Sequence, residues 1–330
     1  MWPAAKLKRF RTNLLAWFGE QRRDLPWRRT KDPYAIWISE IMLQQTRVAA
    51  VIPYFERFLA RFPCYESLAA ASEEEGLRHW AGLGYYYRAR NMQKAAKLMC
   101  ELGEFPRDYD GILALPGVGD YTAAAVASIA FDLPHAVVDG NVARVVSRLL
   151  ASNEGRKQVV EIAGELLDRE RPGDFNQAMM ELGATLCLPK NPHCLLCPVA
   201  KMCKARELGV QAEFPAKKVK AKNKDIERAL FWIERRGKVL AWQRPADARL
   251  MPGFWELPEQ EHLPAAMPIS ELGGFQHGIT IHNYRIKVWR TAVPDEFGNC
   301  RWLKIVTLSQ LPLSTIFKKA LSVRSRSVGD

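Results

Sequence analysis

The segment that most constrains the fold spans residues 113–150, where a glycine turn leads into an alanine-rich stretch and then into an aspartate. The paired glycines of residues 115–119 permit a tight turn with positive φ and leave backbone N–H groups uncovered. The alanine content of residues 122–131 predicts a helix directly after this turn. Such a turn suits a phosphate ligand, because free N–H groups and the helix dipole both favour an anion.

Length and charge limit the possible functions. The chain has 330 residues, which predicts two domains. It carries 48 Lys and Arg against 36 Asp and Glu, and the resulting charge of +12 favours a polyanionic partner, either nucleic acid or an anionic membrane surface. The sequence contains no apolar run of about 18 residues and no signal-peptide core. We therefore expect a soluble intracellular protein, cytoplasmic in a bacterium.

The order of helix, LPGVG hairpin, helix and Val-Asp-Gly-Asn segment resembles the helix-hairpin-helix DNA glycosylases. The resemblance implies a mostly α protein with a two-lobed helical domain over residues 1–212, its hairpin at about 113–122 and an iron–sulfur cluster loop at 187–203. A smaller α+β domain would follow. The resemblance also implies that Gly117, Val118 and Gly119 contact the DNA backbone.

Glu40 is the anomaly in residues 34–46, which are apolar on nearly every face and predict a buried helix. A carboxylate in that setting is either paired with an arginine or partly desolvated, and desolvation would raise its pKa and keep it available as a proton donor. The string EIMLQQTRV resembles the adenine-specific DNA glycosylases that act opposite oxidised guanine. That resemblance makes Glu40 the general acid.

Asp139 precedes a stretch with helical periodicity and is a natural N-cap. Capping alone would explain it. The same position at a helix N-terminus also keeps a carboxylate ionised, so Glu40 and Asp139 together form the acid and anion pair that glycosidic cleavage needs. The resemblance implies that Tyr121 and Asn141 order this site. It further assigns three residues to the base pocket, namely Trp27, Arg28 and Glu181.

Two short segments are expected to enter the duplex. Residues 81–90 combine glycines, tyrosines and arginines, and such a loop can fill the gap left by an extruded base and contact phosphates. A tyrosine cluster is usually core, so the flanking glycines and cations decide this interpretation. Either an aromatic residue or Leu83 can act as this wedge, and we expect Arg88 to meet DNA phosphates. The resemblance assigns insertion beside the target to Gln45 and Tyr85.

Four cysteines, Cys187, Cys194, Cys197 and Cys203, follow the spacing C-x6-C-x2-C-x5-C. So dense a group in a large protein indicates a metal site and not disulfides. Four thiolates suit either tetrahedral zinc or a cubane cluster, and the residues alone do not separate the two. The spacing coincides with the cluster loop of the endonuclease-three and adenine glycosylase branch. The resemblance therefore implies a structural 4Fe-4S cluster that shapes a basic, phosphate-binding loop.

The second domain is expected after a basic linker at residues 213–226. Apolar stretches at 229–233, 238–242 and 284–289 predict strands of a small α+β domain over 227–316. The string GFWELP at 253–258 resembles the strand signature of Nudix pyrophosphatases, but no arginine- and glutamate-rich helix able to hold magnesium follows. The domain is thus expected to be Nudix-like without hydrolase activity. We expect residues 317–330 to form a disordered basic tail.

In the resembling family, a His-x-Phe-Ser-His loop of this domain reads the oxidised guanine. Here His277 and Thr280 keep the first histidine and the hydroxyl, whereas Ile279 replaces the aromatic residue and Ile281 the last histidine. His282 comes one position late. Because a one-residue shift in a strand turns a side chain to the other face, we expect His282 not to substitute.

The resemblance implies a monomeric base-excision-repair enzyme that removes adenine mispaired with 8-oxoguanine or guanine from double-stranded DNA. Bifunctional pyrimidine-damage relatives carry a lysine where this chain has Tyr121, so monofunctional hydrolysis is expected. Two alternatives stay open within the same superfamily: a bifunctional pyrimidine-damage glycosylase and a T:G mismatch thymine glycosylase, a class in which tyrosine can occupy this position. A non-catalytic iron–sulfur DNA-binding scaffold is the alternative from another class. The sequence leaves docking of other repair proteins open.

Overall fold

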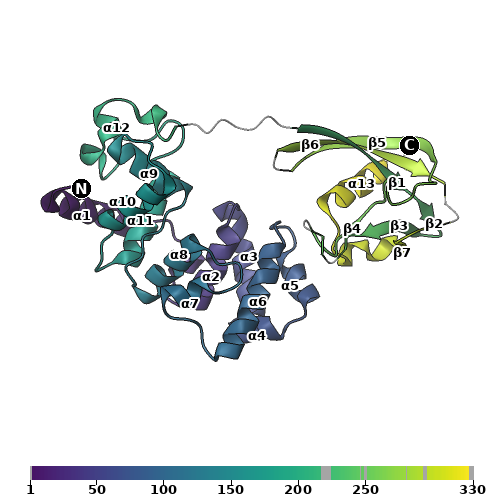
Figure 1. Ribbon diagram of the computed structural model, residues 1–330, viewed down its shortest axis with the longest axis horizontal. Helices are drawn as coiled ribbons and strands as arrows, with labels where there is room; N and C mark the ends of the chain where they lie inside the picture. The colour runs from purple at the N-terminus through teal and green to yellow at the C-terminus, as the bar shows by residue number, and fades with distance from the viewer. Residues whose placement is uncertain are drawn as a thin grey trace. The chain divides into compact units, whose positions relative to one another are not determined.

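The computed structural model describes residues 2–216, 224–245, 247–248, 251–279, 281–292 and 296–326, and it contains two compact units, residues 1–218 and 219–330 (Figure 1). The first unit is helical, as its sequence predicts. Its elements are α1 (Ala4–Gln21), η1 (Pro26–Arg28), α2 (Pro33–Leu43), α3 (Val48–Arg61), α4 (Tyr65–Ala70), α5 (Glu73–Trp80), α6 (Tyr87–Leu102), α7 (Tyr109–Leu113), α8 (Asp120–Phe131), α9 (Gly140–Leu150), α10 (Arg156–Leu166), α11 (Pro172–Thr185), η2 (Ala200–Met202), α12 (Lys204–Glu207) and η3 (Gln211–Glu213).

Local sequence signals account for several helix boundaries. The Asp32 carboxylate accepts hydrogen bonds from the first free N–H groups of α2, and Pro33 occupies the first helical position, where its missing N–H costs nothing. Ser72 followed three residues later by Glu75 is the pattern of a helix N-terminus, and α5 begins there. Ser72 is extended and caps α5 through the N–H of Glu75, so residues 67–80 divide between α4 and α5.

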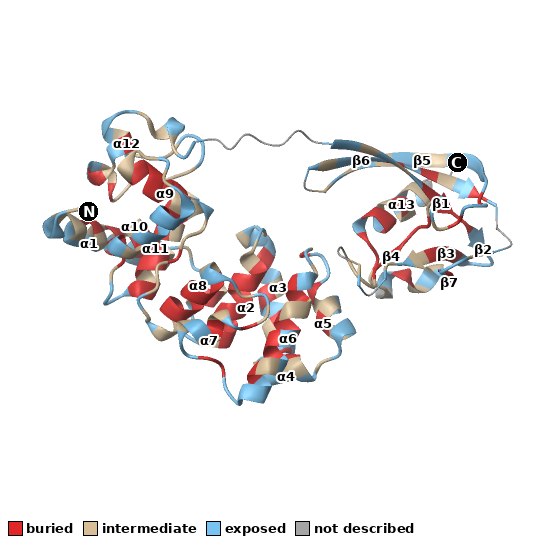
Figure 2. Ribbon diagram, viewed as in Figure 1, coloured by how far each residue is buried: buried red, intermediate tan, exposed pale blue. Residues whose placement is uncertain are grey.

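The first unit has two separate hydrophobic cores, visible as two groups of buried segments in Figure 2. One core is formed mainly by α2 to α8. The other is formed by α1, α9, α10 and α11 together with part of the cysteine loop. This arrangement corresponds to the expected two-lobed helical domain.

The hairpin lies between α7 and α8. Gly117 has φ +80°, and a Cβ atom there would lie 2.7 Å from Cβ of Asn91. Glycine is therefore required at this position on both conformational and steric grounds. Gly119 is extended and precedes the first residue of α8.

The second unit contains two sheets. In the first, β1 (Lys224–Trp232) runs parallel to β6 (His282–Thr291), and β6 runs antiparallel to β5 (Pro268–Ile279). In the second, β3 (Lys238–Gln243) pairs with β2 (Glu234–Arg235), β4 (Trp255–Glu256) and β7 (Cys300–Lys304). The predicted strands correspond to β1, β3 and β6. The expected linker at 213–226 overlaps β1 by three residues, Lys224 to Ile226, and its residues 217–223 lie outside the described ones.

The expected disordered tail is wrong for the residues that the structure describes. Residues 315–326 form α13 (Thr315–Arg326), which packs against β5 and β4. Ile316, Phe317 and Ala320 recur at helical spacing and are buried, with Phe317 0% exposed, while Lys318 points to solvent. The segment was expected to be disordered because it is highly charged, although its apolar residues lie on one face of an amphipathic helix. Within the described ranges, no helix has the length and apolar character needed to cross a membrane.

Candidate active site

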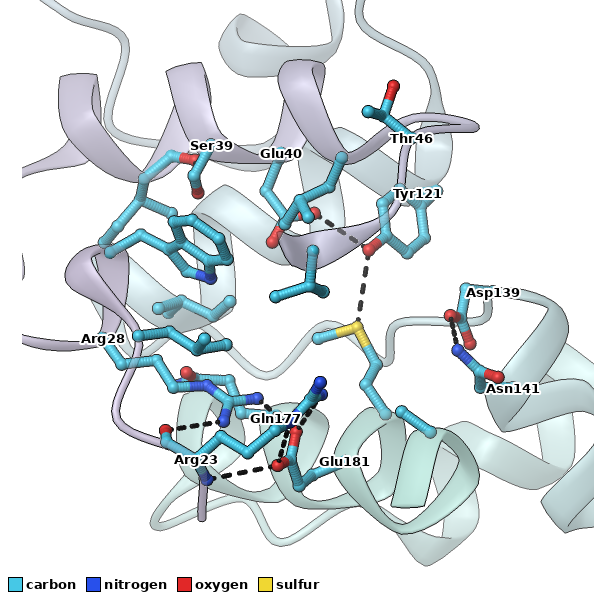
Figure 3. A pocket seen from close by; sticks show the side chains of 18 residues that line it. Arg23, Arg28, Ser39, Glu40, Thr46, Tyr121, Asp139, Asn141, Gln177 and Glu181 are labelled. Carbon is cyan, nitrogen blue, oxygen red and sulfur yellow. Dashed lines mark hydrogen bonds and ion pairs between the residues drawn. The ribbon is translucent and has the colours of Figure 1, made fainter. Parts of the chain in front are cut away.

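The two predicted catalytic carboxylates line one cavity of about 210 Å³ in the first unit (Figure 3). α2 supplies Glu40, α8 supplies Tyr121, and the residue before α9 supplies Asp139. The loop around η1 and the inward face of α11 complete the wall. The polar lining of this cavity consists of Arg23, Arg28, Ser39, Glu40, Thr46, Tyr121, Asp139, Asn141, Gln177 and Glu181.

Glu40 has the environment of a proton donor. Glu40 is only 5% exposed, and this burial raises the pKa of its carboxyl group to about 7. The Tyr121 hydroxyl donates a 2.8 Å hydrogen bond to Oε2 of Glu40 and opposes the shift, whereas the charge of Asp139 adds to it. A carboxyl group with this pKa can deliver a proton at neutral pH.

Asp139 faces the same cavity and is the N-cap of α9. One carboxylate oxygen accepts a 2.7 Å hydrogen bond from the N–H of Val142, and the other accepts a 2.9 Å bond from the side-chain amide of Asn141. Asn141 is itself held by Arg144, whose guanidinium donates to its amide oxygen at 2.8 Å. Capping and orientation toward the cavity thus use the same side chain.

The opposite wall carries a fixed charge cluster around Glu181. Arg23 donates two hydrogen bonds of 2.7 Å to the two carboxylate oxygens, and Arg28 donates a third of 2.9 Å. Burial alone would raise the pKa of Glu181, but these bonds outweigh it and lower the pKa to about 2. Trp27 lies beside them and is 7% exposed, with its ring edge-on to Phe55. The wall therefore offers both polar groups and an aromatic surface.

Sequence reasoning missed several residues of this cavity, among them Arg23, Gln177 and Met180. Arg23 shares a loop with Arg28, but its partner Glu181 is 158 positions away. Gln177 and Met180 lie on α11 within one turn of Glu181, and Met180 Sδ is 3.4 Å from the Tyr121 hydroxyl. For the two residues on α11, their position within one helical turn of Glu181 was the signal that could have indicated them.

The three residues expected to form the DNA wedge differ in exposure. Gln45 and Tyr85 are exposed, Tyr85 by 46%, and both have left-handed backbones with φ +56° and +48°. Leu83 is instead 7% exposed and packs in the core, so it does not project as a wedge here. Arg88 corrects a second expectation: it is 3% exposed and donates to backbone carbonyls, which leaves its guanidinium unavailable to DNA phosphates.

The four predicted cysteine ligands line one small cavity of about 30 Å³. Arg148 donates a 3.3 Å hydrogen bond to Sγ of Cys187, and the thiol of Cys203 donates to the Arg148 carbonyl. Burial raises the pKa of the Cys197 thiol to about 12. Among the described residues, no three of these sulfur atoms lie within 4.8 Å of one another.

The expected reader residues lie at the end of the β5–β6 hairpin in the second unit. Ile279 pairs with His282 and His277 pairs with Tyr284, whereas Thr280 lies outside the described residues. Directly opposed residues of an antiparallel pair project to the same face. His282 therefore shares a face with His277 and Ile279, contrary to expectation, because the chain reverses before it.

Comparison with known proteins agrees with this architecture. Residues 38–169 match the sequence profile of the HhH-GPD superfamily base excision DNA repair proteins. The adenine DNA glycosylase of Homo sapiens is 45% identical over 240 residues, which cover 68% of this chain and 44% of that protein. The chain thus matches less than half the length of this relative. Its counterpart in Buchnera aphidicola subsp. Schizaphis graminum is 36% identical over 247 residues, covering 70% of this chain and 71% of that protein.

One solved structure extends the comparison to the fold. A thermostable thymine-DNA glycosylase superposes with a TM-score of 0.58 at 33% identity, covering 62% of this chain and 98% of that one. Together with the sequence relatives, this likeness confirms the predicted helix-hairpin-helix fold class. The chain therefore belongs to the adenine DNA glycosylases of the HhH-GPD superfamily of base excision DNA repair proteins.

Proposed function

We propose that this chain is a monofunctional DNA glycosylase that removes adenine mispaired with 8-oxoguanine or guanine. The observation that carries the proposal is the buried Glu40, hydrogen-bonded to Tyr121 in a cavity that Asp139 also lines. A raised-pKa acid and a second carboxylate are the groups that acid-assisted cleavage of a glycosidic bond requires.

The reaction starts with extrusion of adenine from the duplex, because the glycosidic bond is inaccessible within the base stack. Glu40 donates its proton to N7 of the base. The bond between N9 and C1′ then breaks, and its electron pair leaves with the neutral adenine. Asp139 stabilises the cationic sugar, either electrostatically or by transient covalent capture, and Asn141 holds this carboxylate in place. Water adds to C1′ and returns a proton to the site, which leaves an abasic sugar.

The wall opposite Glu40 would hold the base. Trp27 offers a ring for stacking, and Arg28 and Glu181 offer a donor and an acceptor to polar edges. Exposed backbone at Gly117, Val118 and Gly119 would bind a phosphate next to the extruded nucleotide.

Tyr121 supports hydrolysis without strand cleavage. A lyase would need an amine at this position to form a Schiff base with the sugar. Burial, together with the charge of Glu40, raises the pKa of the Tyr121 phenol well above its usual value. Tyr121 therefore stays a neutral hydrogen-bond donor and cannot replace a lysine.

We further propose that Cys187, Cys194, Cys197 and Cys203 hold a 4Fe-4S cluster. When bound, the cluster supplies a structural cross-link that shapes the loop after α11. The second unit is proposed to be Nudix-like and to read the opposite base through His277, Ile279, Thr280 and His282. His282 is included in this set because it lies on the same face of the hairpin as His277.

A single-turnover excision assay tests the proposal. Duplexes would carry A opposite 8-oxoguanine, A opposite G, and T opposite G, each with and without alkali to reveal abasic sites. We expect alkali-dependent cleavage of the adenine strand, fastest opposite 8-oxoguanine. Equal rates of adenine release opposite 8-oxoguanine and opposite G would contradict the proposal that the second unit reads the opposite base. Release of thymine alone would favour the thymine-glycosylase alternative.

Two substitutions separate the enzyme from a non-catalytic scaffold. Glu40→Gln and Asp139→Asn should each abolish most base release, by roughly 10²-fold or more, while DNA binding is largely kept. The exposed Glu20 on α1 gives a matched control, Glu20→Gln, which should excise normally. DNA binding without base release by the unsubstituted protein, and unchanged in all three variants, would support the scaffold.

A further inference from the structure

The Arg88 side chain connects the end of α2, the loop after α2 and the loop that precedes α6. One guanidinium nitrogen points at the carbonyls of Ile41, Met42 and Gln44, at 2.9 and 3.2 Å from the first two. The other donates to the carbonyls of Leu83 and Gly84 at 3.1 and 3.2 Å.

The first group of carbonyls belongs to the end of α2 and the loop after it. The last carbonyls of a helix have no partner within the helix, and Arg88 supplies one. Glu40 precedes Ile41 directly, so the helix end that carries the proposed acid is fixed at this point. The guanidinium also lies over the ring of Trp80 at 5.1 Å.

Both loops that Arg88 holds carry an exposed residue in a left-handed backbone. Gln45 follows Gln44, and Tyr85 follows Gly84. A non-glycine residue in this conformation is strained and persists only when its surroundings impose it. The Arg88 guanidinium lies 5.3 Å from the Tyr85 ring centroid and bonds the peptide group before each residue.

We propose that Arg88 is a positioning residue that presets Gln45 and Tyr85 as a rigid two-pronged wedge for opening the duplex. The proposal rests on the proposed base-extruding function and adds to it. A wedge that is ordered before binding does not lose conformational freedom on DNA, so more of the binding energy is available for unstacking the target base. Lysine cannot replace this arginine, because a single ammonium cannot reach both groups of carbonyls.

The test compares adenine in a mismatch with adenine in an unpaired bulge of the same sequence, where little stacking has to be broken. We expect Arg88→Lys to slow single-turnover excision from the mismatch roughly tenfold or more, but from the bulge by no more than about threefold. Arg90→Lys is the matched control, since Arg90 lies on the same helix and its guanidinium pairs with Glu73 on α5. Equal losses on both substrates, or no loss on either, would overturn the proposal.

A second variant guards against misfolding. Arg88→Met keeps the length of the side chain without leaving an unpaired buried charge, and should show the same difference between substrates.

A binding measurement separates this proposal from the proposed chemistry. With 2-aminopurine as the target base and Glu40→Gln to prevent cleavage, DNA binding should raise the fluorescence, and Arg88→Met should abolish the rise. A rise without adenine release by the unsubstituted protein would contradict the glycosylase and keep the wedge, whereas a rise that survives Arg88→Met would contradict the wedge.

Discussion

The hydroxyl of Tyr121 lies 2.8 Å from Oε2 of Glu40 and donates a hydrogen bond to it. This bond lowers the pKa of Glu40 against the larger effect of burial, which raises it. The balance of the two sets the pH range in which Glu40 holds the proton that the proposed reaction needs.

The first prediction concerns that pH range. Excision should fall about tenfold per pH unit above the pKa of Glu40, which is about 7. Tyr121→Phe removes the bond that lowers this pKa, so the decline should begin at higher pH. Single-turnover rates from acidic to alkaline pH measure both effects. A decline that stays in place or moves to lower pH in Tyr121→Phe would contradict the assignment of Glu40 as the acid.

The second prediction is that Glu40 destabilises the fold at alkaline pH. Its folded pKa of about 7 exceeds the ordinary value of 4.5, so the folded state binds the proton more tightly and loses stability as pH rises through this range. Glu40→Gln should therefore raise the free energy of unfolding by up to about 3 kcal/mol above pH 7. Below the ordinary pKa the two proteins should be equally stable. Urea unfolding at both pH values is the measurement, and a stability gain independent of pH would contradict the prediction.

The third prediction concerns the Glu181 cluster. Glu181→Gln leaves the guanidinium groups of Arg23 and Arg28 without their carboxylate, and the Arg28 side chain is only 10% exposed. We expect a loss of about 3 kcal/mol in unfolding free energy. The exposed pair of Arg29 and Asp24 provides a control, Asp24→Asn, which should cost far less. Similar losses in the two variants would show that burial does not strengthen the Glu181 cluster.

The fourth prediction concerns the cysteine cavity. Cys203→Ser should lower iron and sulfide content and destabilise the core formed by α1, α9 and α11, because Cys203 packs against that core. Cys100→Ser changes an exposed cysteine outside the loop and should retain full iron content. Zinc in stoichiometric amount, with no sulfide, would establish the other metal instead.

The fifth prediction concerns α13. Phe317 is fully buried between the helix and the sheet of the second unit, so Phe317→Ala should cost about 3 to 5 kcal/mol in that unit. Lys318→Ala alters the exposed neighbour and should be nearly neutral. Hydrogen exchange resolved by segment can assign the loss to the second unit. Equal protection in both variants would contradict the packing of α13.

The sequence predicted the features that depend on near neighbours. The glycine at 117 marks the hairpin, because this signal acts within one turn of chain. Glu40 was recognisable as a candidate acid because it interrupts an apolar helix. The structure places it with Tyr121 and Asp139 in one cavity, which the helix-hairpin-helix resemblance implied.

The features that could not be predicted depend on distant partners. Nothing near Arg88 in the sequence indicates that its guanidinium would meet carbonyls of residues 41–44, so an arginine beside tyrosines was interpreted as a phosphate contact. Arg23 was missed because its partner is on α11. His282 was assigned to the wrong face because the alternation rule holds within one strand, and the chain reverses after Ile279.

The burial of α13 also has a genetic consequence. A premature stop codon just before codon 315, where α13 begins, would leave every helix of the first unit encoded. It would nevertheless remove Phe317 and Ala320 and uncover the apolar side chains of Leu230, Ile286 and Val288 beneath them. We expect such alleles to yield an aggregation-prone product that proteases degrade, so that a nonsense mutation far from every catalytic codon behaves as a null.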